Sequence, residues 1–157
     1  MIILGIDPGT TTTGFGLVRL EKHCYKLLDY GVIATKPKIP LPEKLIEIYQ
    51  DISQIIQETS PDLVAVEKLF FLNNAKTAMA VGQARGVVLL AAAKAKKEIL
   101  EFTPLEVKLS VCGHGRADKV QVQNMVKAIL KLDFLPKPDD AADALAVAIC
   151  GHNNCKY

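Results

Sequence analysis

The sequence lacks an apolar run long enough to cross a membrane. Its longest apolar stretches are interrupted by Lys, Arg or Gly well short of the roughly 20 residues that a spanning helix requires. The opening residues, MIILGID, carry neither a basic flank nor a small-residue cleavage site, so we expect a first β-strand there and no signal peptide. These features predict a cytoplasmic protein.

Cysteine is scarce, and its spacing is unlike that of a zinc site. The tripeptide Cys-Gly-His occurs at 112–114 and again at 150–152, whereas zinc ligands usually come as C-x2-C or H-x3-H pairs. Reduced, free thiols are the better interpretation and agree with a cytoplasmic location. A Ser–His–Asp or Cys–His catalytic arrangement is not evident either, and His114, beside a glycine-rich loop, is a lone candidate base.

The chain of 157 residues is the size of one domain, and half of its residues are hydrophobic, which is enough for a buried core. We see no internal repeat, linker or low-complexity segment. We therefore expect a single domain over residues 1–150 and a short C-terminal tail over 151–157. The net charge of +2 alone says little about binding to nucleic acid.

The apolar pattern changes several times between short strand-like runs and helical spacing. It predicts strands at 2–7, 15–20, 25–35, 62–67 and 99–103, and helices at 41–59, 75–97, 104–111, 118–132 and 139–150. The short link between the second and third strands suggests a hairpin. A hairpin-led sheet followed by strand–helix units indicates an α/β fold with a five-stranded mixed sheet flanked by helices.

Asp7 and Glu67 each occupy the last position of an expected apolar strand. If these strands are parallel neighbours, both side chains point into one crevice at the strand ends, where open α/β sheets bind ligands. Adjacent strands lie about 4.8 Å apart, so two such carboxylates can share a metal ion. Each also has an ordinary alternative, because Asp7 precedes a Pro-Gly turn and Glu67 can simply emerge into solvent.

Asp143 is harder to explain as a surface residue, because it lies within the apolar segment AADALAVAI. A charged group on a buried helix is costly unless it is paired or bound to a cation. Asp140 is three residues away and Asp139 four, so either can share a helix face with Asp143, and periodicity does not choose between them. Either can also serve as a helix cap or a first-turn acid.

Several acids in one pocket repel one another unless cations neutralise them. A set of carboxylate oxygens suits Mg²⁺ or Mn²⁺ better than zinc or copper. One or two such ions can activate water and stabilise the leaving oxygen of a phosphodiester. Without the four candidate acids, 19 Lys and Arg face 13 Asp and Glu, an excess of six positive charges that suits a polyanionic substrate.

A second interpretation starts from the glycine- and threonine-rich segment that follows Asp7. Residues 5–14 resemble the first phosphate motif of sugar kinases and actin-like ATPases, and the loop 9–14 offers amides and hydroxyls to a phosphate. Those enzymes close two lobes around a nucleotide, and 157 residues hardly provide one lobe. A single-lobe nucleotide-binding relative therefore remains the alternative function.

Four segments in chain order carry a family resemblance: ILGIDPGTTTTGFG, AVEKLFF, GQARG at 82–86, and DAADALAVAI. Together they are specific and extend over nearly the full length. The chain resembles the RuvC family of crossover-junction endodeoxyribonucleases, which have an RNase H-like fold. The resemblance implies a homodimer that binds a four-way (Holliday) junction and nicks two strands of like polarity. It also implies Mg²⁺ dependence and partnership with the RuvA–RuvB branch-migration complex in DNA recombination and repair.

The resemblance also implies roles for individual residues. The catalytic acids of the family fall on Asp7, Glu67, Asp140 and Asp143, because the family pattern D-A-A-D matches residues 140–143. Asp139 is then an extra acid beside the site.

Three other residues match positions that contact DNA in the family, and a fourth is a further candidate. Phe70 matches an aromatic that stacks on bases at the junction centre. Lys108 and Lys119 match basic positions near the active site, and Arg116 is a further candidate for a phosphate contact. The helix at 75–97 would lie at the dimer interface, in agreement with the small residues Gly82 and Gly86 on one of its faces.

Overall fold

The computed structural model describes residues 1–22, 24–68 and 75–154, and it contains one five-stranded sheet with the order β3-β2-β1-β4-β5. β1 pairs antiparallel with β2 and parallel with β4, β2 pairs antiparallel with β3, and β4 pairs parallel with β5. The predicted mixed sheet and its hairpin are therefore confirmed. The strands are β1 (Ile2–Asp7), β2 (Thr12–Glu21), β3 (Cys24–Ala34), β4 (Leu63–Glu67) and β5 (Glu98–Phe102).

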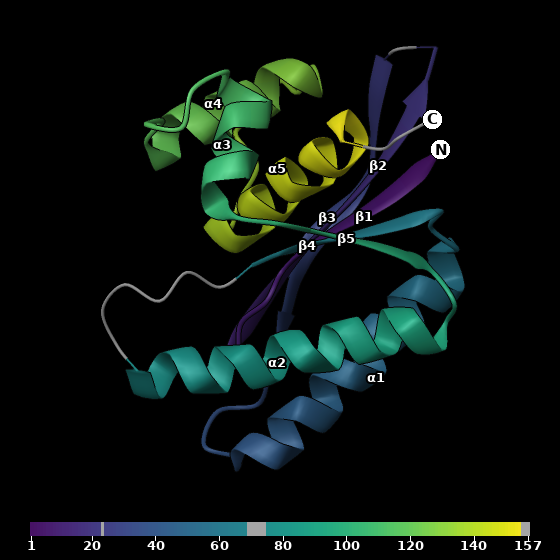
Figure 1. Ribbon diagram of the computed structural model, residues 1–157, viewed down its shortest axis with the longest axis vertical. Helices are drawn as coiled ribbons and strands as arrows, with labels where there is room; N and C mark the ends of the chain where they lie inside the picture. The colour runs from purple at the N-terminus through teal and green to yellow at the C-terminus, as the bar shows by residue number, and fades with distance from the viewer. Residues whose placement is uncertain (23, 69–74, 155–157) are drawn as a thin grey trace.

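Helices cover both faces of this sheet (Figure 1). One face is covered by α1 (Leu41–Thr59) and α2 (Ala75–Lys94), and the other by α3 (Pro104–Cys112), α4 (Lys119–Ile129) and α5 (Asp139–Asn153). None of the helices in the described ranges is long and apolar enough to span a membrane.

Several element boundaries differ from the sequence-based expectation. α2 ends at Lys94 and not at residue 97, and α4 ends at Ile129 and not at residue 132. Two further differences have a physical reason. β2 begins at Thr12 and not at Phe15, because residues 12–14 pair with Val32, Ile33 and Ala34 on β3. The last helix continues past residue 150 to Asn153, because the buried Gly151 still packs on the sheet beside Ala65. The remaining residues of the expected tail, 155–157, lie outside the described ranges.

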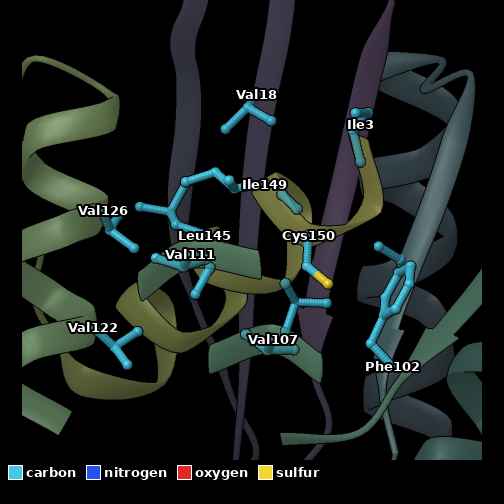
Figure 2. Close-up of a cluster of buried hydrophobic side chains, with 14 of the residues drawn as sticks. Ile3, Val18, Phe102, Val107, Val111, Val122, Val126, Leu145, Ile149 and Cys150 are labelled. Carbon is cyan, nitrogen blue, oxygen red and sulfur yellow. The ribbon is translucent and has the colours of Figure 1, made fainter. Parts of the chain in front are cut away.

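The sheet separates two hydrophobic clusters. The cluster in Figure 2 joins α3, α4 and α5 to the sheet, and its large buried side chains include Ile3, Leu145 and Ile149. The other cluster joins α1 and α2 to the opposite face through residues such as Leu4 and Ile52. Because side chains alternate along a strand, β1 contributes to both clusters, as expected for a central strand that is covered on both faces.

α5 lies directly on the backbone of β1 and β2, with no layer of side chains between them at two glycines. A Cβ atom on Gly5 would collide with the backbone of Ala144 and Ala148, and one on Gly14 would collide with the carbonyl group of Asp140. Glycine at these positions therefore allows α5 to approach the middle of β1 and the start of β2 closely. The start of α5, with its two aspartates, is fixed against the sheet by these contacts.

Substituting Gly14 with alanine should push the first turn of α5 away from β2. We expect Gly14→Ala to lower the free energy of unfolding by about 2 kcal/mol, as overpacking against rigid backbone usually does. Urea denaturation measures this loss. Gly31→Ala on β3 is the control, since a Cβ there meets only the ring of Phe15, which can shift. Equal stability losses in the two variants would contradict the proposed tight contact of α5.

Candidate active site

The parallel pairing of β1 and β4 places Asp7 beside Glu67. Ile6 is in register with Val66, and the two acids are the next residues on these neighbouring strands. The interaction between their carboxyl groups favours the protonated form of Asp7 and the ionised form of Glu67. The sequence predicted that the two acids share one crevice if their strands are parallel neighbours, and the pairing satisfies that condition.

The electrostatics of this pair are dominated by burial and by nearby negative charge. Burial first, and then the carboxylates of Glu67, Asp143 and Asp140, raise the pKa of Asp7 to about 8. Burial also raises the pKa of Glu67, although its hydrogen bond with Asp7 and the positive charge of Lys108 act in the opposite direction. At neutral pH, Asp7 is therefore favoured in its protonated form. The remaining negative charge of the site would be neutralised by a bound cation.

Asp140 and Asp143 reach this pair from α5. The cross-strand partner of Asp7 is Gly14, and the backbone of Asp140 occupies the space that a side chain at Gly14 would fill. Asp140 thus lies over the end of β1, and Asp143 follows one turn later on the same helix. Burial raises the pKa of Asp143, while its ion pair with Lys119 opposes that shift. The negative charges of Glu67, Asp140 and Asp143 all act on Asp7.

A cavity of about 240 Å³ lies next to these acids. Glu67 and Asp143 form part of its wall, together with the side chains of Lys108 and Lys119. The Nζ atom of Lys119 is 3.2 Å from Oδ2 of Asp143. The rest of the wall is largely apolar, with Pro104, Val107, Val122 and Ala146. This pocket combines acids that suit a cation with two ammonium groups that suit a phosphate.

The predicted site residues fall into two groups. Four of them line this pocket: Glu67, Lys108, Lys119 and Asp143. Asp7 and Asp140 do not line it, but Asp7 is adjacent to Glu67 and the charge of Asp140 acts on Asp7. Arg116 lies in the exposed loop before α4 and does not line the cavity. Phe70 lies outside the described residues.

The donor chemistry of the pocket fits a hard divalent cation, because several carboxylate oxygens face one partly buried space. Within residues 1–22, 24–68 and 75–154, no three His, Cys, Asp or Glu side chains already surround a common metal position. Two of the acids are engaged by other groups: Asp7 is held in its protonated form beside Glu67, and Lys119 forms an ion pair with Asp143. A bound cation would replace both the proton and the ammonium group.

Asp139 has a contact that sequence reasoning did not find. The N-cap position of α5 is Pro138, so Asp139 is not the helix cap. Its carboxylate instead accepts a hydrogen bond from Gln123 and forms an ion pair with Lys119. The only signal in the sequence is the spacing of Lys119 and Gln123, which lie four residues apart on one helix face. Nothing in that spacing identifies Asp139 as their partner.

The glycine- and threonine-rich segment is structured differently from a phosphate loop. Thr12 and Thr13 belong to β2, and the buried hydroxyl group of Thr13 donates to the carbonyl of Gly9 at 2.7 Å. The same oxygen accepts from the Gly9 amide at 3.3 Å. Because this hydroxyl closes the turn internally, the nucleotide-binding alternative is not favoured.

The repeated Cys-Gly-His segments lie at the ends of two helices. Cys112 ends α3, and Cys150 lies in the last turns of α5. Cys24, Cys112 and Cys150 are free thiols, and Cys155 lies outside the described residues. Burial raises the pKa of Cys150 to about 11, so this thiol is protonated and unreactive at neutral pH.

Comparison with known proteins supplies the family. The sequence model described as "Crossover junction endodeoxyribonuclease RuvC" matches residues 3–152. A protein of that name from Alkaliphilus oremlandii is 57% identical over 150 residues, which cover 96% of this chain and 92% of that protein.

Solved structures agree with the sequence comparison. RuvC of Thermus thermophilus is 38% identical, has a TM-score of 0.88, and matches 96% of this chain and 92% of its own. The T. thermophilus protein in complex with a Holliday junction substrate is 35% identical with a TM-score of 0.86, again covering 96% and 92%. The five-stranded mixed sheet is thus the RNase H-like fold of this family. The chain belongs to the RuvC family of crossover junction endodeoxyribonucleases.

Proposed function

We propose that this chain resolves four-way (Holliday) junctions by metal-dependent hydrolysis of phosphodiester bonds, and that Asp7, Glu67, Asp140 and Asp143 hold the metal. The observation that carries the assignment of residues is the convergence of these acids at the ends of β1 and β4 beneath the start of α5. Family membership supports the reaction, and a related protein has been crystallised with a Holliday junction substrate.

The chemistry divides between the cation and the side chains of this chain. When bound, one or two Mg²⁺ ions, for which Mn²⁺ can substitute, supply a site for the attacking water and for the leaving oxygen. Asp7 must give up its proton before its carboxylate is fully available as a ligand. Lys108 and Lys119 would bind and orient the phosphate at the rim of the cavity.

A nicking assay tests the proposal directly. Purified protein with Mg²⁺ should cut a synthetic four-way junction symmetrically in two strands of like polarity and leave a linear duplex of the same sequence intact. Calorimetric titration with ATP tests the alternative and should give no heat of binding. An absence of metal-dependent nicking, or specific ATP binding, would contradict the proposal.

Contacts with the junction outside the acids are also proposals. Lys108 and Lys119 line the cavity, and the exposed Arg116 lies in the loop that leads into α4, so all three would meet the DNA backbone. Phe70, between β4 and α2 in the sequence, would stack on bases at the junction centre, as the family resemblance implies.

We also propose that α2 forms a homodimer interface. Its exposed positions include Met79, Gln83, Gly86 and Leu90, which recur at helical spacing and form one stripe. Met79 and Leu90 are 69% and 54% exposed, and a Cβ at Gly86 would meet nothing within 4 Å. A second copy of the helix would cover this stripe and allow two active sites to cut two strands.

Charged residues on this stripe should separate the two copies. We expect the double variant Met79→Glu/Leu90→Glu to sediment as a monomer at micromolar concentrations at which the unmodified chain sediments as a dimer. Its paired cutting of a junction should fall by about tenfold, since each monomer can then cut one strand only. Ile46→Glu is the matched control, because Ile46 is 55% exposed on α1. A dimer that survives the double variant would contradict the assignment of α2.

Three further expectations are part of the proposed function. Partnership with the RuvA–RuvB complex follows from the family and would place this chain at the junction after branch migration. A DNA-cutting enzyme would act in the compartment that holds the DNA, which keeps the cytoplasm as its proposed location. The domain is proposed to extend over residues 1–150, although α5 continues to Asn153.

A further inference from the structure

The ammonium group of Lys119 lies between two aspartates that belong to the same helix. Its Nζ atom is 3.2 Å from Oδ2 of Asp143, inside the carboxylate pocket, and 3.3 Å from Oδ2 of Asp139, outside it. Only Asp143 of these two acids faces the cavity. Lys119 thus has two partners: Asp143, which would also bind a cation in the pocket, and Asp139, which would not.

The outer partner is held in a defined orientation. Nε2 of Gln123 donates to Oδ1 of Asp139 at 2.9 Å, which leaves Oδ2 directed at Lys119. Lys119 and Gln123 are four residues apart on α4 and therefore lie on one face of it. The start of α4 is itself fixed, because Asp118 and Gln121 form a reciprocal capping box there. The carboxylate of Asp139 is thus held by Gln123 and Lys119, two side chains of a helix whose start is capped.

This arrangement contributes little to the stability of the fold. Both partners are exposed, with 48% of the Lys119 side chain and 59% of the Asp139 side chain accessible to solvent. Ion pairs in such positions add little to the free energy of folding. Their effect lies in where the ammonium group is held, which is at the rim of the pocket that also contains Lys108 and Glu67.

A cation held by Asp143 would compete with Lys119 for the carboxylate of that residue. If Asp143 were the only partner, the long side chain would be released into solvent when a metal ion bound, at a cost in ordering when phosphate arrived. With Asp139 as the second partner, the ammonium group stays at the rim. The same second partner also weakens the hold of Lys119 on Asp143 and so eases entry of the metal.

We propose that Asp139, oriented by Gln123, is a positioning residue that retains the Lys119 ammonium group at the rim of the active site when a metal ion takes Asp143. This rests on the proposed function, in which Asp143 is a metal ligand and Lys119 contacts phosphate. Asp139 itself touches neither the metal nor the substrate. Its effect therefore has to pass through Lys119.

A double-variant experiment tests that route. At saturating Mg²⁺, Asp139→Asn should lower the single-turnover rate of junction cleavage about tenfold, and Asp139→Glu should recover most of it. In a Lys119→Gln background, Asp139→Asn should cause no further loss, because the residue it positions is gone. Asp133→Asn, which removes an exposed acid from the same α4–α5 connection, is the control and should keep the unmodified rate. Losses that multiply in the double variant would overturn the proposal, as would an unchanged rate in Asp139→Asn.

Metal binding without DNA gives a second readout. Asp139→Asn should weaken Mn²⁺ binding about threefold in calorimetric titrations, because Lys119 then has Asp143 as its sole partner. The same substitution in the Lys119→Gln background should leave the Kd nearly unchanged, and equal weakening in both backgrounds would overturn the proposal.

The variant Asp143→Asn distinguishes a failure of the proposed function from a failure of the positioning role. If Asp143→Asn still cleaves the junction, the proposed function fails. If it is inactive while Asp139→Asn behaves as the unmodified protein, only the positioning role fails.

Discussion

Asp7→Asn is expected to lower the rate of junction cleavage at saturating Mg²⁺ by at least about a thousandfold, because it removes one member of a set of catalytic groups that act together. Asp7 ends the central strand β1, and the charges of Glu67, Asp140 and Asp143 all act on it. An amide keeps the shape of the side chain but removes one anionic oxygen ligand. The site would then hold the cation weakly and in altered geometry.

Binding of the junction should survive the same substitution. Affinity for DNA comes mainly from basic residues that contact phosphates, and Asp7→Asn removes none of them. Gel-shift titration without divalent metal should therefore give a Kd within about threefold of the unmodified protein. Lys119→Gln is the informative comparison, because it should weaken binding and leave Asp7 in place. Loss of junction binding by a folded Asp7→Asn protein would contradict this division between acids and lysines.

Asp7→Asn should also stabilise the metal-free protein at alkaline pH. The pKa of Asp7 rises from 3.8 to about 8 in the folded state, through burial and the neighbouring acids. Between those two values the folded protein keeps a proton that the unfolded chain has lost, so the free energy of unfolding falls as the pH rises. At pH 8 the substitution should therefore add about 3 kcal/mol, roughly half of what the full shift would give, since the acids share the effect.

Urea denaturation in the presence of a chelator measures this effect, at one protein concentration because of the proposed dimer. The two proteins should differ little at about pH 4, where Asp7 is protonated in the folded state, and most at about pH 8. Saturating Mg²⁺ should reverse the order at pH 8, because the metal stabilises only the protein that retains the full set of ligands. A variant that is less stable at pH 8 without metal would show that the Asp7 carboxylate is not under electrostatic strain.

Periodicity and strand-end logic predicted the fold and part of the site. The order of elements determined the mixed sheet, and the apolar surroundings of Asp143 marked that residue because a buried charge requires a partner. The parallel pairing of β1 and β4 then brings Asp7 beside Glu67, as strand-end geometry predicts. These features are local or follow from general rules of sheet architecture.

Other features depended on contacts that no local pattern encodes. Spacing did not separate Asp139 from Asp140, and only the family resemblance favoured the latter. In the structure the two residues have different contacts: the backbone of Asp140 packs on Gly14, whereas the side chain of Asp139 contacts Gln123 and Lys119 on α4. These contacts depend on how α4 packs against α5, which is a feature of the tertiary structure that the local sequence does not encode.

The contact of α5 with Gly5 and Gly14 has a consequence for how the site tolerates change. Where side chains separate a helix from a sheet, rotamers can absorb a substitution, but here backbone meets backbone. The spacing between the strand acids and the helix acids is therefore not adjustable in small steps. Side chains on the α4 side of the pocket can move to accommodate a substitution, whereas the contact between α5 and the strands cannot. New substrate preferences should therefore arise on the α4 side while the contact of α5 with β1 and β2 stays constant.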